Sequence, residues 1–197
     1  ISQIPNIQCR VSLPSYFYIP AELYYEFGPI LADEILKNGK MEALNNALFG
    51  YINNGLNTLP TSEQIYDPAR FFIDERYEEL TSKTIELDNY ILIDEGSFGA
   101  LDLVYLMQDK IGQTNAINAA VGIGGGNWKD YEDSSGNLLM TLKLTGDNKD
   151  ELQEIYEAFI LWGNAQSRFS SSESYLNGSL FKGSTNFWIY SDQSFIR

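Results

Sequence analysis

The sequence predicts an α+β fold: a helical first half, followed by a β-hairpin, a helix and a strand. Between residues 20 and 49, apolar side chains recur every three or four positions, which is the spacing of one helix face. From Leu138 to Thr145 they mostly alternate with polar ones, as on the two faces of a strand. We expect a single domain over the whole chain, with a helical lobe over 1–114, an α+β lobe over 122–197 and a soft boundary near 115–121.

The N-terminal part contains an amphipathic helix pair. From Pro20 to Phe49, acidic residues occupy most of the positions between the apolar ones. Asn38-Gly39 is a typical helix stop and separates the two helices, and the polar stretch 53–55 ends the second.

A short helix and a longer one are expected next. Thr61 and Gln64 have the spacing of a capping box, in which each side chain accepts a hydrogen bond from the backbone of the other residue. Pro68 ends this helical turn. Further on, an apolar run from Phe98 to Met107 follows the turn-forming residues 94–97 and predicts another helix.

The second half begins with the predicted hairpin. Its first strand is the segment 122–132, and the turn is the Asp-, Ser-, Gly- and Asn-containing stretch 133–137. Asp147 is expected to cap the following helix, which has two acidic residues in its first turn. In the tail, 187–190 and 194–196 are short strand candidates.

Composition excludes several classes of function. The net charge is −14 and the 13 basic residues are scattered among 27 acidic ones, which argues against binding to nucleic acid or anionic membranes. The sequence has no apolar run long enough to span a membrane. It has no histidine and a single cysteine, Cys9, so it cannot form a Ser-His-Asp or Cys-His catalytic site or a His- or Cys-based zinc site. We expect no cofactor, no metal and no catalytic residue in this chain.

Carboxylates are the remaining candidates for catalysis or metal binding. Neighbouring acidic residues occur at 78–79, at 94–95 and at 130–133. The last stretch superficially resembles a calcium-binding loop, but Ser135 and Thr141 stand where an EF-hand has glycine and glutamate. Solvated faces or turns, and a hairpin tip at 130–133, are the favoured interpretations.

Two further groups of residues are candidates for binding. Gly122, Gly124 and Gly125 lie in a glycine-rich segment that lacks the other residues of a Walker or dinucleotide-binding motif, so close backbone packing or a bulged strand is the expected role. Aromatic residues of the second half could form a platform for a sugar or a peptide, or could be core residues of strands. These are Trp128, Tyr131, Trp188 and Tyr190.

The segment Leu59 to Pro68 resembles the P-x-S-T-E-Q-I/V-L-H-P motif of a large group of secreted bacterial and archaeal metallopeptidase-like proteins of the gluzincin type, which have an HExxH zinc site. Segments 97–101 and 119–126 are similar to two further segments of that group, in the same order. Asp67 replaces the motif histidine, and Gly126 replaces an acidic residue. The motif residues, for which we expect a structural role, are Pro60, Thr61, Ser62, Glu63, Gln64 and Pro68.

The resemblance implies that zinc ligands lie upstream of this region, and none is assigned to this chain. The chain runs from Ile1, which is not a methionine, to Arg197, and we expect it to be a piece of a longer protein. The expected function is a non-catalytic supporting or interaction domain of an extracellular or cell-surface protein, whose partner is the rest of its own polypeptide or another chain. A possible glycosylation sequon at 177–179 fits an extracellular loop. The alternatives are the substrate-side half of an active zinc peptidase and a carbohydrate- or peptide-binding module.

Overall fold

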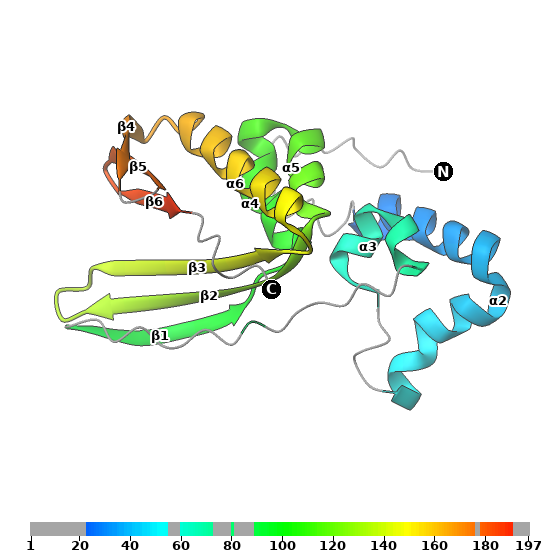
Figure 1. Cartoon of the computed structure of the whole chain (residues 1–197). Helices are drawn as coiled ribbons and strands as arrows, with labels where there is room; N and C mark the ends of the chain where they lie inside the picture. The colour runs from blue at the N-terminus through cyan, green and yellow to red at the C-terminus, as the bar shows by residue number, and fades with distance from the viewer. Residues whose placement is uncertain (1–22, 55–59, 73–79, 81–88, 176–177, 191–197) are drawn as a thin grey trace, which may run out of the picture.

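A computed structural model of the chain describes residues 23–54, 60–72, 80, 89–175 and 178–190. The fold is α+β, as predicted: helices dominate the first half, and two three-stranded antiparallel sheets lie in the second. Figure 1 shows the larger sheet as three long strands that extend well beyond the helices packed at one of its ends.

The N-terminal helical region consists of a π-helical turn, η2 (Leu23–Phe27), and the helix α2 (Gly28–Asn54). The helical path breaks at Lys40, where φ is 57° and ψ is −168°, so α2 is two helices joined by a kink. The predicted helix pair is therefore confirmed, and its break lies one residue beyond Asn38-Gly39.

A short helix, α3 (Ser62–Tyr66), and a 3-10 turn, η4 (Pro68–Phe72), follow. The predicted capping box is confirmed: the Gln64 N–H donates to Thr61 Oγ1 at 3.2 Å, and the Thr61 N–H donates to Gln64 Oε1 at 3.1 Å. These elements and α2 form a small apolar cluster of their own. Its members are Leu31, Ile35, Ala43, Leu44, Ala47, Ile65 and Phe71.

The larger sheet has the order β1-β2-β3. The predicted hairpin is confirmed, because β2 (Ile123–Asp133) pairs with β3 (Leu138–Gly146) across a turn. The third member, β1 (Tyr90–Ser97), corrects an expectation: residues 94–97 belong to this strand and not to a turn. Their polar and glycine-containing sequence is compatible with a strand here because most of β1 is exposed to solvent.

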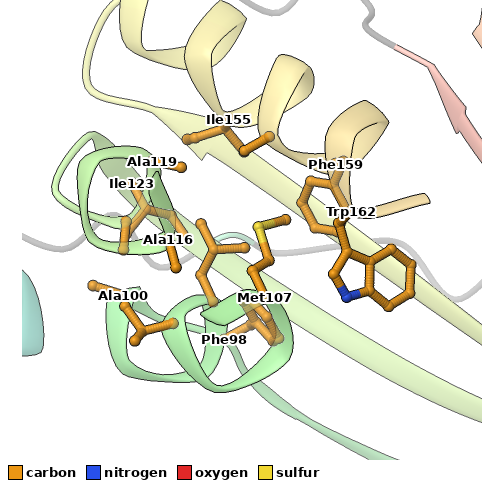
Figure 2. Packing of buried hydrophobic residues seen from close by; sticks show 13 residues of the cluster. Phe98, Ala100, Met107, Ala116, Ala119, Ile123, Ile155, Phe159 and Trp162 are labelled. Atoms are coloured by element: carbon orange, nitrogen blue, oxygen red, sulfur yellow. The ribbon is translucent and has the colours of Figure 1, made fainter. Parts of the chain in front are cut away.

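Three helices cover the inner end of this sheet: α4 (Ala100–Ile111), α5 (Gln113–Ala120) and α6 (Lys149–Asn164). Figure 2 shows apolar side chains of all three directed toward one shared interior, which is the main hydrophobic core. Leu103 and Met107 are completely buried there. Helices α4 and α5 thus share a core with the second half of the chain, and the boundary expected near 115–121 lies inside that core.

The smaller sheet comprises β4 (Phe169–Tyr175), β5 (Gly178–Gly183) and β6 (Phe187–Tyr190). It packs on α6 through aromatic rings, with the ring centre of Phe187 5.3 Å from that of Trp162. The predicted strand at 187–190 is confirmed. Strands β4 and β5 were not predicted, because their sequences are rich in serine and glycine. The strand candidate at 194–196 lies outside the described residues.

The alternation in β3 predicts the strand correctly. It does not predict that the apolar residues of one face are buried at one end of the strand and exposed at the other. Leu142 and Leu144, near the helices, pack against the main core. Leu138 and Met140, toward the hairpin tip, are 73% and 57% exposed. The reason is visible in Figure 1, where the outer half of the hairpin extends past the helices that cover its inner half.

Candidate functional site

Arg70 of η4 lies at the centre of a cluster of acidic side chains. Its guanidinium contacts Glu63 at 3.0 Å, Asp67 at 3.4 Å, Asp147 at 2.9 Å and Glu151 at 2.5 Å. The Arg70 side chain is only 14% exposed. Asp147 is exposed as a whole residue, but its side chain is only 18% exposed, so its ion pair with Arg70 is largely shielded from water. We call these five residues the Arg70 cluster.

Local helix signals place the first half of the Arg70 cluster. The capping box holds the start of α3, where Glu63 lies in the first turn and is buried. Asp67 ends α3, and its side chain accepts a hydrogen bond from the Ala69 N–H at 3.3 Å. Pro68 then starts η4, because its fixed φ suits the first position of a helical turn. The Arg70 side chain therefore contacts Glu63 and Asp67, which both precede it in sequence.

The second half of the Arg70 cluster comes from the junction of β3 and α6. The cap of α6 is Asn148 and not Asp147 as expected from the sequence, because Asn148 Oδ1 accepts from the Asp150 and Glu151 N–H groups at 2.9 and 3.1 Å. Its side-chain amide also donates to Glu151 Oε2 at 2.7 Å. Asp147 is left to bind Arg70.

The glycine-rich segment lies directly against these acids. A Cβ on Gly122 would lie 2.6 Å from the Cβ of Glu151, and one on Gly124 would lie 3.0 Å from Asp147 Oδ1. The Asp147 N–H donates to the Gly122 carbonyl at 3.1 Å. The strand register shifts between Ile123 and Gly125, as a bulge would produce. Close packing and a bulged strand are thus the observed roles of this segment.

The start of α4 connects to both of the other segments. The Leu101 N–H donates to Ser62 Oγ of the capping-box motif at 3.3 Å. The Phe98 N–H donates to the Gly126 carbonyl at 2.9 Å. The segment 97–101 therefore contacts both the described part of the capping-box segment, 60–68, and the glycine-rich segment 119–126, and these last two segments lie at the Arg70 cluster.

The interactions of the Arg70 cluster are those of a structural ion-pair network that holds two parts of the fold together. Four carboxylates from the described residues share one guanidinium, and their oxygens are directed at Arg70, at backbone N–H groups or at the Asn148 amide. Within the described ranges, no group of three or more His, Cys, Asp or Glu side chains is arranged to hold a metal ion. The cluster joins the elements of the small apolar cluster to those of the main core.

The four aromatic candidates do not share one surface. Trp128 and Tyr131 are an odd number of residues apart in β2, so their side chains lie on opposite faces of the larger sheet. Trp128 packs against the main core with its indole over Gly96, and Tyr131 is 1% exposed. Trp188 lies in β6 of the other sheet and is 42% exposed, and the side chain of Tyr190 lies outside the description.

The acidic stretches fall in different places. Residues 94–95 lie in β1, and residues 130–133 lie at the end of β2, next to the hairpin turn. Asp133 holds that turn through Asn137, and the hydrogen bonds from the side chain and backbone of Asn137 lower the pKa of Asp133. The pair at 78–79, Cys9 and the sequon residue Asn177 lie outside the described residues.

Sequence reasoning missed the centre of the cluster. Arg70 lies 77 positions before Asp147 and 81 before Glu151, and those two residues were expected only as a helix cap and part of an acidic first turn. The available signal was an arginine two residues after a helix-ending proline in a strongly acidic chain, because arginine is the residue best suited to pair with several carboxylates. Their distance along the chain hides this arrangement.

Comparison of the chain with models of protein families, with curated proteins and with solved structures finds no match. Among the helices described here, none is both long enough and apolar enough to cross a membrane.

Proposed function

We propose that this chain is a non-catalytic supporting or interaction domain of an extracellular metallopeptidase-like protein. The observation that carries the proposal is that the segment 97–101 contacts both of the other resembling segments, which themselves lie at the Arg70 cluster. A motif order that reflects a common architecture should have a structural reason, and mutual packing of the three segments is such a reason.

The use of the motif's polar groups supports a structural role. Thr61 and Gln64 close a capping box, Ser62 accepts a hydrogen bond from α4, and Glu63 is buried against Arg70. Each of these groups is engaged in a contact within the protein, and Glu63 and Gln64 are buried. The 197 residues contain no histidine, so an HExxH zinc site would have to be contributed by another segment or chain.

The alternative from the same family is the substrate-side half of an active zinc peptidase. In that case the zinc ligands would lie on a segment before Ile1 or on a partner chain. The residues encoded before Ile1 separate the two possibilities, because an intact HExxH followed by a glutamate ligand would favour the active peptidase.

A hydrolysis assay tests the proposal on the chain itself. The purified chain is incubated with zinc and a mixture of unstructured peptides, and the peptides are followed by mass spectrometry. We expect every peptide to stay intact. Cleavage that a chelator abolishes, and that survives repurification of the chain to constant specific activity, would overturn the proposal.

A further inference from the structure

The outer half of the larger sheet presents a regular array of apolar and acidic side chains on one face. Directly paired residues of antiparallel strands lie on the same face. One row across the sheet consists of Asp94, Asp130 and Met140. The next row, nearer the hairpin tip, consists of Ile91, Glu132 and Leu138. We call these six residues the outer face.

The apolar members of the outer face are far more exposed than a core role would allow. Ile91 is 67% exposed, Leu138 is 73% exposed and Met140 is 57% exposed. The row closer to the body of the protein contains Trp128 and Leu142, which pack against the main core. The outer face therefore continues an apolar surface past the point where the helices of this chain cover it (Figure 1).

The acidic members of the outer face have no basic partner in the part of the chain that the structure describes. Asp94 and Asp130 are directly opposite each other on adjacent strands, an arrangement of like charges that destabilises a sheet. Glu132 lies two residues further along β2 on the same side. Among the described residues, no lysine or arginine forms an ion pair with any of these three carboxylates.

We propose that the outer face docks a cationic, apolar segment of a partner polypeptide. Such a segment would cover the three exposed apolar side chains and bring lysine or arginine to the three carboxylates, so both unfavourable features would be relieved together. This proposal rests on the interaction role proposed above and names its surface and the chemistry of its partner.

The charges disfavour the other occupants. A second copy of this chain would bring another net charge of −14, and its own outer face would add three more carboxylates. Anionic lipid headgroups and nucleic acid are repelled for the same reason. A neutral apolar surface would leave the carboxylates buried without a counter-charge, which is costly.

A binding experiment with the full chain tests the proposal. The probe is a fluorescein-labelled 12-residue peptide made only of leucine, isoleucine and lysine, and its matched control has glutamate at every lysine position. Fluorescence anisotropy should show saturable binding of the lysine peptide, weakened by salt, and at least tenfold weaker binding of the glutamate peptide.

Two sets of variants locate the binding surface. Ile91→Ser with Leu138→Ser and Met140→Ser should weaken binding at least tenfold. A control of the same three residue types on α2 should leave binding within twofold, although its members are similarly exposed, at 56%, 55% and 59%. This control is Ile30→Ser with Leu48→Ser and Met41→Ser.

A second pair of variants tests the charges without risk of unfolding. Asp94→Asn with Asp130→Asn and Glu132→Gln removes repulsion, so the fold should be as stable as before while binding weakens about tenfold. The control changes net charge equally at exposed positions elsewhere, and should reduce binding less than threefold. It combines Glu26→Gln, Glu42→Gln and Glu154→Gln.

The outcomes separate this proposal from the one it rests on. Absence of binding, equal effects of outer-face and control variants, or binding only to neutral lipid vesicles would overturn the docking proposal. So would a dimer of the chain, seen by light scattering, that the outer-face serine variant dissociates. Cleavage of the probe, checked by mass spectrometry, would instead overturn the proposal that the domain is non-catalytic.

Discussion

Replacing Arg70 by methionine removes the guanidinium that four carboxylates share, and should be one of the most destabilising single changes in the described part of the chain. The Arg70→Met side chain keeps much of the apolar stem but no charge. Glu63, whose side chain is 10% exposed, would be left as a buried charge, and Asp147 and Glu151 would face it at 18% and 19% exposure. Asp67, at 42% exposure, contributes less.

The size of the loss follows from these exposures. Removing one partner of a fully buried ion pair costs about 3–5 kcal/mol, and the partial exposure here places the loss near the lower end, at about 3 kcal/mol. For a chain of this length each kcal/mol lowers the melting temperature by roughly 2–4 °C, so Arg70→Met should melt roughly 6–12 °C below the wild type. Urea and thermal unfolding followed by circular dichroism measure both quantities.

Two further variants serve as comparisons for Arg70→Met. Arg70→Lys keeps the charge but cannot present a planar fork to acids on both sides, so its stability should lie between wild type and methionine. Lys37→Met breaks an exposed ion pair with Asp33 and should leave the unfolding curve unchanged within error. If Arg70→Met unfolds within about 0.5 kcal/mol of the wild type, the Arg70 cluster is a surface feature and does not hold two parts of the fold together.

Three smaller changes test the surroundings of the cluster and the hairpin turn. Gly122→Ala places a Cβ 2.6 Å from the Cβ of Glu151 and should cost about 1–3 kcal/mol in urea unfolding. Asn148→Ala removes the cap of α6 and should cost about 1 kcal/mol by the same measurement. Asn137→Ala removes the largest cause of the lowered pKa of Asp133, so NMR titration should show that pKa rising toward its ordinary value.

Each of these three changes has a control or a result that would contradict it. The hydrogen bonds to Asp133 stabilise its charged form, so their contribution is present above the ordinary carboxyl pKa and is lost as the pH falls through the lowered folded value. Asn137→Ala should therefore differ from wild type at neutral pH and converge with it in acid; an unchanged titration would refute the assignment. Gly99→Ala meets Ser62 Oγ at 3.4 Å, an ordinary contact, and should cost less than Gly122→Ala. An Asn148→Ala protein as stable as wild type would rule out the cap.

Signals that are local in sequence predicted the elements well. The capping box, the helix stop near Asn38-Gly39 and the hairpin turn at 133–137 each depend on residues a few positions apart, and the structure contains all three. Errors arose where tertiary context decides the outcome. Residues 94–97 form part of the exposed edge strand β1, where polar residues and glycine are tolerated. The sequence pattern and the strand propensities of these residues do not show that they pair with β2.

The site shows the same limit more strongly. Sequence reasoning identified the capping-box motif and the glycine-rich segment but treated them as separate features. Their link is Arg70, which contacts Glu63, seven positions before it, and Glu151, 81 positions after it. A contact between residues so far apart produces no periodicity and no motif in the sequence, so it can be recognised only in the folded structure.

The central claim, that this chain is a supporting domain without its own zinc site, is tested most directly by titrating zinc into the purified chain in a calorimeter. We predict no stoichiometric tight binding, because ordinary zinc sites use histidine or cysteine, and this sequence has no histidine and one cysteine. A single tight site with one zinc ion per chain would contradict it.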